Sequence, residues 1–294
     1  MTWIHELYGK YQQEFRSRYP DAALTAEEFA DTFGPVLEGL ERVEIEGQGV
    51  LFYRVWDEGT RQICAVPLFG YAADSDEVLT ELFTRLSAAL VPQKSTVFQV
   101  HLYAHDTAAQ RAFSMMQFGY MAETGSMVLP VAPADGAFEI RTLTAGEITA
   151  HWAEIWAMTS GIVAHLQQAP VFYPGSEFTE EVYRDFFLDE TTRLHAAFDE
   201  GGRMVGMIET NDEAETLLSP AVRSVNVGEV YVVPSKRGSG LSDALLRYAA
   251  AYEAGRGAAF LWVEHGTANP QARRFWGRYF ETYGYELDRT VERL

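Results

Sequence analysis

The segment 230–242 constrains the fold more than any other part of the chain. It opens with Val-Tyr-Val-Val, a β-branched and aromatic run that is typical of a strand, and Pro234 stops that strand. A basic, glycine-rich turn, Lys-Arg-Gly-Ser-Gly, comes next, and apolar residues then recur at helical spacing at Leu241, Leu245 and Tyr248. A strand, a tight turn and a helix in this order predict an α/β fold.

The predicted start of this helix has the chemistry of an anion site. The first N–H groups of a helix have no intrahelical acceptor and carry a partial positive charge, so they bind phosphate. Gly238 and Gly240 have no Cβ and would let a pyrophosphate approach the backbone, while Lys236 and Arg237 add positive charge. The competing interpretation is a tight strand-to-helix turn without a ligand. Neither the Walker A spacing nor the dinucleotide fingerprint is present, which weakens a third interpretation, a nucleotide-phosphate transferase.

The charge of the chain narrows the class of partner. The formal net charge is -19 over 294 residues, and a field of this sign repels polyanions, so we expect no nucleic-acid partner. The same field would attract a cationic amine, although solubility is the simpler explanation.

No run of about 18 apolar residues is present, so no membrane span is predicted. Cys64 is the only cysteine, and we expect no metal site.

The first residues and the cysteine content predict a cytoplasmic protein. Trp3, Ile4, Leu7 and Tyr8 recur every three or four residues, which indicates an amphipathic helix rather than a signal peptide. A single cysteine excludes internal disulfides. Cys64 lies in an apolar run, where a buried strand cysteine is favoured over a reactive thiol.

A proline- and glycine-rich segment at 129–136 predicts a linker between two domains. Thr25 and Glu28 have the spacing of a capping box before the second helix of the first half. Near their ends, both halves repeat the order strand, strand, helix, strand, helix, strand. The predicted strands are 49–56, 62–69, 96–103, 121–129, 138–140, 192–198, 203–209, 225–233, 259–264 and 285–293. The later predicted helices are 79–90, 107–117, one long helix after Thr144, 179–188, 238–254 and 269–280.

The second half resembles the GNAT N-acetyltransferase superfamily over roughly 138–294. The superfamily's acetyl-CoA signature is a strand with Val-x-Pro followed by Arg-x-x-Gly-x-Gly/Ala. Here Arg237 and Gly240 match it, and Ser242 stands where glycine or alanine is usual. The resemblance implies that acetyl-CoA binds along the strand and the turn, and that acetyl passes directly to an amine without a metal. It assigns to the cofactor Val232, Val233, Lys236, Arg237, Gly238, Ser239, Gly240, Leu241, Ser242, Asn269, Phe275 and Trp276.

A second feature of the superfamily lies near the end of the chain. Asn269 is followed by Ala272, by the aromatic pair Phe275-Trp276 and by a Gly-Tyr pair at 284–285. Asn269 before a proline is also a good helix N-cap, which we expect to be its main role, with contact to the cofactor secondary. The aromatic stripe of this helix is expected to belong to the core.

The first half resembles a degenerate second copy, so the whole resembles a tandem GNAT protein. The implied fold class is α/β, with two GNAT-like domains, each a mixed, mostly antiparallel sheet flanked by helices. Residues 1–130 form the domain without a cofactor loop and 138–294 the acetyl-CoA-binding domain. The segment 69–77 corresponds to the anion turn, but Asp74, Asp76 and Glu77 would charge it negatively. Coincidence is the alternative to duplication.

The catalytic residues are expected on the two strands that part at the site. Glu229 is the candidate base, since members of the superfamily often place a glutamate there, and a solvated strand-end carboxylate is the alternative. Glu264 and His265 end the next strand, where either could also face the substrate. The usual tyrosine acid falls on Trp276, which cannot donate in that way. The substitutes considered for the acid are Tyr231, Tyr279 and Tyr283.

The sequence therefore predicts an acyltransferase that moves acetyl from acetyl-CoA to a primary amine of a small molecule. Aminoglycosides, polyamines, amino acids and protein N-termini all remain open as acceptors. The alternative function is a non-catalytic acetyl-CoA sensor or scaffold, which the missing tyrosine supports.

Overall fold

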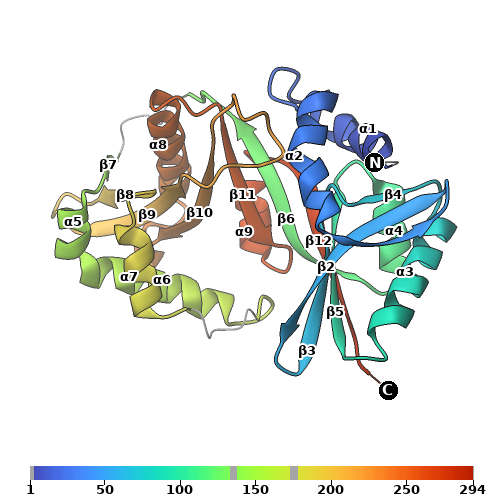
Figure 1. The fold of residues 1–294 in the computed structure, drawn as a ribbon. Coiled ribbons are helices and arrows are strands. Elements are labelled where there is room, and N and C mark those ends of the chain that lie inside the picture. Colours follow the sequence, from blue (N-terminus) through green and yellow to red (C-terminus); the bar gives the residue numbers. More distant parts are fainter. Residues whose placement is uncertain (1–2, 133–137, 173–177, 294) are drawn as a thin grey trace.

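One mixed β-sheet runs through both halves of the chain (Figure 1). The computed structural model describes residues 3–132, 138–172 and 178–293. Within these residues the strand order is β1-β2-β3-β5-β12-β6-β11-β10-β9-β8-β7, with β4 paired to β2 outside this path. The result is an α/β fold whose mixed sheet is flanked by helices. The predicted linker falls partly at 133–136, outside the described residues.

The first half begins with two helices and ends in strand β6. The capping box predicted at Thr25 and Glu28 is present, with both reciprocal hydrogen bonds. Cys64 is fully buried in β3, as the apolar run around it predicted. The elements are α1 (Ile4–Phe15), α2 (Ala26–Glu38), β1 (Glu41–Ile45), β2 (Gly49–Glu58), β3 (Arg61–Val66), β4 (Tyr71–Ala73), α3 (Asp76–Leu90), β5 (Thr96–Tyr103), α4 (Thr107–Met115) and β6 (Gly119–Val128).

The second half follows the predicted order with small corrections. The long helix predicted after Thr144 is two helices, broken at His151, and the last helix ends at Trp276 rather than Phe280. The elements are β7 (Glu139–Thr142), α5 (Ala145–Ala150), α6 (Trp152–Leu166), α7 (Glu180–Leu188), β8 (Thr192–Phe198), β9 (Met204–Asn211), β10 (Ser224–Val232), the 3-10 turn η1 (Pro234–Lys236), α8 (Leu241–Gly255), β11 (Phe260–Gly266), α9 (Pro270–Trp276) and β12 (Glu281–Val291).

The two halves exchange their final strands. β6 ends the first half but pairs with β11 of the second, and β12 ends the second half but pairs with β5 of the first. β6 and β12 also pair with each other, all three ladders being antiparallel. Each half therefore completes its sheet with a strand from the other, and the two predicted domains share one sheet. The division at 130 and 138 stays a prediction.

Three buried apolar clusters hold the helices onto this sheet. The first joins α1–α4 to the strands of the first half, and Tyr283 and Leu287 of β12 belong to it. The second lies between α8 and the strands β9, β10 and β11. The third lies under α5, α6 and α7 on the opposite face of β8 and β9, where Leu194 and Met207 are buried. Strands β8–β10 thus have α8 on one face and α6 on the other (Figure 1).

Candidate active site

The parallel strands β10 and β11 part after a short common stretch. They pair only from Ser224 to Asn226 on β10, and beyond this point β10 stays with β9 while β11 stays with β6. A β-bulge in β10, between Val227 and Val230, adds to the divergence. A cavity of about 710 Å³ opens between the separated strands, lined by both of them, by α6 and by the starts of α8 and α9.

The start of α8 forms one end of this cavity. Gly238 and Gly240 have φ values of 75° and 85°, in the left-handed region that only glycine adopts without strain. Gly240 is the N-cap, has no side-chain cap, and accepts the first intrahelical hydrogen bond from Ala244 (3.0 Å). The N–H groups before Ala244 are therefore not used inside the helix. Arg237 is exposed beside them, with its Nε donating to the Val232 carbonyl (3.1 Å).

Glu229 lies in the bulge of β10, on the wall of the cavity. The hydroxyl of Tyr183, from α7, donates to Glu229 Oε1 at 2.6 Å. The other oxygen, Oε2, is buried and has no hydrogen-bond partner among the described residues. Burial raises the pKa of the Glu229 carboxyl to about 7, although the Tyr183 hydrogen bond acts in the opposite direction. A carboxyl with this pKa is suited to exchange protons near neutral pH.

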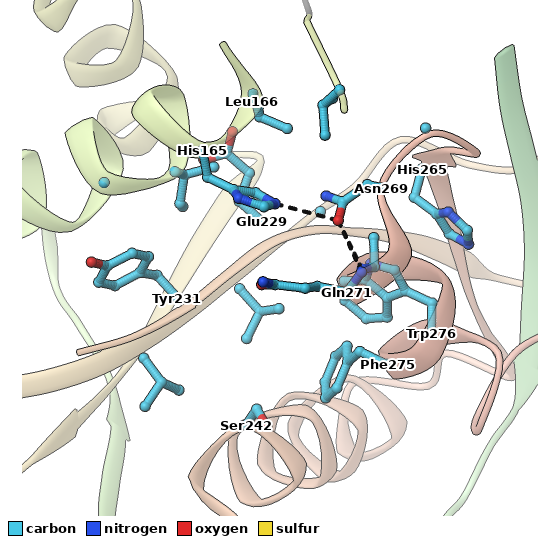
Figure 2. A pocket seen from close by; sticks show the side chains of 18 of the residues that line it. His165, Leu166, Glu229, Tyr231, Ser242, His265, Asn269, Gln271, Phe275 and Trp276 are labelled. Atoms are coloured by element: carbon cyan, nitrogen blue, oxygen red, sulfur yellow. Dashed lines mark hydrogen bonds between the residues drawn. The ribbon is translucent and has the colours of Figure 1, made fainter. Parts of the chain in front are cut away.

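The opposite wall comes from the end of β11 and the start of α9. His265 lines the cavity, and burial lowers its pKa, which favours the neutral imidazole at neutral pH. Asn269 caps α9, accepting from the N–H groups of Gln271 and Ala272. Its Oδ1 also accepts from His165 Nε2 at 3.3 Å, so α6 and α9 meet across the cavity (Figure 2).

Most of the predicted site residues line the cavity. Figure 2 shows Phe275 and Trp276 of α9 between Ser242, at the start of α8, and Asn269. Val233, Ser239 and Gly240 do not line the cavity but adjoin residues that do. The residues named from the sequence that line it are Glu229, Tyr231, Val232, Lys236, Arg237, Gly238, Leu241, Ser242, Glu264, His265, Asn269, Phe275 and Trp276.

Two predicted candidates for the acid lie elsewhere. Tyr283 is 2% exposed and packs against Phe15 in the core of the first half, because β12 is exchanged into that half's sheet. Its hydroxyl donates to Glu215. Tyr279 follows the end of α9, and its hydroxyl donates to Asp243 of α8 (2.5 Å). Neither lines the cavity, whereas the third candidate, Tyr231, does.

Among the residues at or behind the cavity that were not predicted, four bear on the side chains of the site: Gly161, His165, Tyr183 and Glu209. Gly161 of α6 leaves room for the Tyr231 ring, since a Cβ there would lie 2.6 Å from the Tyr231 hydroxyl oxygen. His165 and Tyr183 come from helices remote in sequence, so no local pattern indicated them. Glu209 of β9 lies behind Glu229, and the one available signal was the glycine before Glu229, which predicts a bulge within a strand.

The cavity has features that fit a pyrophosphate group with an extended arm. One end offers unused helix N–H groups, two glycines in the left-handed conformation and the cations Lys236 and Arg237, which fit a pyrophosphate. The adjoining edge of β10 is unpaired with β11 and fits an extended arm.

Among the described residues, no group of three or more His, Cys, Asp and Glu side chains is placed to hold a metal ion. No helix in the described part of the chain is long and apolar enough to cross a membrane.

The second half of the chain matches a known protein family. Residues 161–281 match the model of the acetyltransferase (GNAT) family. The sequence matches none of the curated proteins. A GCN5-related N-acetyltransferase from Sphaerobacter thermophilus has a similar structure, with a TM-score of 0.55 at 16% identity over 98% of this chain and 92% of that one. A ribosomal-protein-alanine N-acetyltransferase from Brucella melitensis biovar Abortus aligns with 48% of this chain and 89% of its own, at 19% identity and a TM-score of 0.38. The fold is therefore GNAT-like, and the family match suggests acyl transfer.

Proposed function

We propose that the second half of the chain binds acetyl-CoA at the start of α8 and transfers the acetyl group to a primary amine of a small molecule. The observation that carries this proposal is the cavity between β10 and β11. It has an anion-binding helix N-terminus at one end and a buried carboxyl with a pKa of about 7 on its wall. The match of residues 161–281 to the acetyltransferase (GNAT) family supports the same reaction.

The proposed roles of the residues follow from their positions. Acetyl-CoA, when bound, supplies an activated thioester. Glu229 takes one proton from the acceptor ammonium, so that its carboxylate becomes a carboxylic acid and the nitrogen gains a free lone pair. The C–N bond then forms as the C–S bond breaks, and the second proton of the nitrogen passes to the departing thiolate, which gives the amide and free coenzyme A. Glu229 returns its own proton to water. A backbone N–H of β10 near Val232 would polarise the thioester carbonyl, whereas the Val233 N–H is not available, because it donates to the Val205 carbonyl at 3.0 Å.

The charge of the cavity favours a cationic acceptor. Its cations, Lys236 and Arg237, flank the anion-binding end, whereas Glu229 and Glu264 line the walls away from it. Ile162, Leu166 and other apolar residues of the α6 wall would contact the body of the acceptor. We therefore propose a small amine with an apolar portion. We propose no role for nucleic acid, a membrane or a metal.

The second candidate function is an acetyl-CoA sensor without catalysis. Trp276 occupies the place of the family's tyrosine, and Tyr279 directs its hydroxyl to Asp243 instead of the cavity. Tyr231 is the remaining tyrosine on the cavity wall that could protonate the leaving thiolate. A coenzyme A thiolate could also leave without an acid, so the missing tyrosine alone does not favour the sensor.

We also propose that the two halves arose as a tandem pair, with the first half as the degenerate copy. The order β2-β3-α3-β5-α4-β6 repeats as β9-β10-α8-β11-α9-β12, with β4 inserted in the first half only. In both sets the first two strands are antiparallel and the crossover is parallel.

A cytoplasmic location remains a prediction from the cysteine content.

The experiment is a thiol-release assay with the full chain, acetyl-CoA and a panel of amines. We expect thiol release to need both substrates, and Glu229→Gln to lower kcat by about 10²–10⁴-fold while the Kd for acetyl-CoA stays within about twofold. Glu139→Gln, an exposed carboxylate on β7, is the matched control and should leave kcat unchanged. Binding of acetyl-CoA without turnover on any amine would favour the sensor. Failure of the wild type to bind acetyl-CoA would exclude both functions.

A further inference from the structure

A second buried carboxyl lies directly behind Glu229. Glu209, on β9, is 4% exposed, and its Oε1 accepts the backbone N–H of Glu229 at 3.1 Å. Its Oε2 is buried without a hydrogen-bond partner among the described residues. Glu209 thus holds the bulge of β10 through the backbone of Glu229. Figure 2 shows the Glu229 side chain on the cavity wall.

The backbone makes room for this second carboxyl. A Cβ added to Gly228 would lie 1.9 Å from Glu209 Oε1, so no other residue fits between Val227 and Glu229 without displacing the carboxyl. The glycine and the bulge therefore belong to one arrangement, in which the Glu209 side chain occupies the space under the kinked strand. An extended strand with a side chain at 228 would have no place for it.

In the part of the chain that the structure describes, no cation lies at hydrogen-bond distance from either carboxyl of the pair. Tyr183 of α7 donates to Glu229, and His165 of α6, which also lines the cavity, is bonded to Asn269. Arg193 of β8 attracts Glu209 but is itself paired with Glu253 of α8 (2.7 Å).

Two carboxyls buried together in this way cannot both ionise near neutral pH at low cost. Burial and then the charge of Glu229 raise the pKa of Glu209 to about 8, above that of Glu229 itself. Glu229 lies on the cavity wall and accepts the Tyr183 hydrogen bond, which favours its charged form, whereas Glu209 is buried behind it. The proton that the pair keeps therefore lies on Glu209.

We propose that Glu209 and Glu229 form a carboxyl pair that shares one proton, in which the protonated Glu209 anchors the bulge of β10 and leaves Glu229 as the charged member facing the acceptor amine. Glu209 is then a positioning residue that acts through Glu229, and the proposal rests on the proposed function, in which Glu229 is the base. In the proton-transfer step an N–H bond of the ammonium breaks and an O–H bond forms on Glu229. Glu209 neither gains nor loses a proton in that step.

The first test is a titration that needs neither substrate nor turnover. The full chain is labelled with ¹³C at the glutamate side-chain carboxyls, and Glu209→Gln and Glu229→Gln assign the two resonances. We expect both carboxyls of the wild type to titrate near or above neutral pH, and the Glu209 carboxyl to titrate at least about one pH unit lower in Glu229→Gln. A Glu209 carboxyl that titrates in the ordinary range near 4.5, or at an unchanged pH in Glu229→Gln, would overturn the pair.

The second test distinguishes the hydrogen bond that Glu209 accepts from the backbone of Glu229 from any effect of a charge on Glu209. Glu209→Gln keeps the shape and the acceptor oxygen of the protonated acid, so we expect kcat at pH 7 within about threefold of the wild type. Glu209→Leu keeps the volume but loses the acceptor, so the bulge is released and kcat should fall by about tenfold or more, with the Kd for acetyl-CoA unchanged. Equal kcat in Glu209→Leu and the wild type, with both folded by circular dichroism, would contradict the anchor.

These outcomes are distinct from failure of the proposed function. If acetyl-CoA does not bind or no amine is acetylated, the titration still decides whether the two carboxyls share a proton. If Glu209→Leu does not fold, the wild-type titration and Glu229→Gln suffice, because neither depends on that variant.

Discussion

The two parallel crossovers of this chain, β3-α3-β5 and β10-α8-β11, use the same order of elements but leave different space between their strands. β3 and β5 stay paired from Gln62 to Val66, the last residue of β3. β10 and β11 pair only from Ser224 to Asn226, and six further residues of β10 diverge from β11. The closed crossover leaves no gap between its strands, whereas the open one has the cavity between them.

The helices that follow the first strand of each crossover begin differently. α3 has Ser75 as its N-cap, whose side chain accepts from Val78 N, with Asp76 and Glu77 in the first turn. α8 begins at Gly240 without a side-chain cap, beside Lys236 and Arg237. Asp74, just before the cap, donates its N–H to the Gln48 carbonyl. In the first half, β4 also pairs with β2 where the second half has its loop.

Asp106 of the first half differs from Glu209 and Glu229 of the second in having a cation beside its carboxylate. Asp106 of the first half pairs with Lys10 at 2.5 Å, which helps to hold its pKa below the usual range despite burial. Glu209 and Glu229 of the second half have no such cation and their pKa values are raised. Asp106 is thus neutralised by a cation of its own half, whereas Glu229, on the cavity wall, is left without one among the described residues. Two regions with the same fold can therefore differ in function, and the candidate site lies where polar groups are not already paired within the protein.

The largest expected effect is at the glycine that caps α8. Gly240→Val forces a β-branched residue to φ near 85° and places methyl groups beside the helix N–H groups, so the Kd for acetyl-CoA should rise by about 100-fold or more. Gly47→Val is the matched control. Gly47 has φ 68° and an added Cβ would meet nothing within 4 Å, so it carries a comparable backbone penalty away from the site. Calorimetric titration of both variants checks the difference; an equal loss of affinity would show that general destabilisation is the cause.

Charge reversal at the same loop should have the next largest effect. Arg237→Glu is expected to weaken acetyl-CoA binding by about 10- to 100-fold, because it places a negative charge beside the pyrophosphate site. Arg85→Glu on α3, an exposed arginine of the first half, should leave the affinity unchanged. The measurement is titration at two salt concentrations. An affinity that responds equally to both substitutions would indicate the overall charge of the chain rather than this loop.

The pH dependence of stability should distinguish the carboxyls of the two halves. A carboxyl whose pKa is raised in the folded state binds more protons there than when unfolded. Its contribution is therefore complete below the ordinary pKa near 4.5 and is lost as the pH rises through about 7 and 8. We expect the free energy of unfolding to fall between pH 5 and pH 8, with a shallower fall in Glu209→Gln. Asp106 has the opposite sign, so Asp106→Asn should not flatten this fall. Urea unfolding across the pH range is the measurement, and equal slopes in the wild type and Glu209→Gln would contradict the assignment.

The smallest expected effect is at the cap of α3. Ser75→Ala should lower the free energy of unfolding by about 1 kcal/mol, because the helix loses its side-chain acceptor. Acetyl-CoA binding should not change, since this helix has no role in the site. Thermal unfolding and calorimetric titration of the same sample test both statements. A change in the Kd for acetyl-CoA would show that the first half contributes to binding.

Much of the fold could be predicted because the signals are local. The capping box at Thr25, the periodic apolar residues of α3 and the strand–turn–helix at 230–242 each depend on neighbours in sequence, and all three are present. The exchange of β6 and β12 could not be predicted. An alternating strand pattern fixes which face is buried but does not name the strand that pairs with it.

The limits of the site prediction have the same origin. The loop residues and Glu229 were found because one short motif contains them. Tyr283 was placed near the site by its distance along the chain, and the exchange of β12 moved it into the other half's core. Glu209 and Tyr183 reach Glu229 only through the packing of β9 and α7.

The most direct test of the account is the stoichiometry of acetyl-CoA binding to the full chain by calorimetric titration. The open crossover of the second half and the closed crossover of the first predict one molecule bound per chain, with the binding lost in Gly240→Val and kept in Ser75→Ala. Two molecules per chain, or binding that survives Gly240→Val, would contradict the central claim that only the second crossover is built to hold the cofactor.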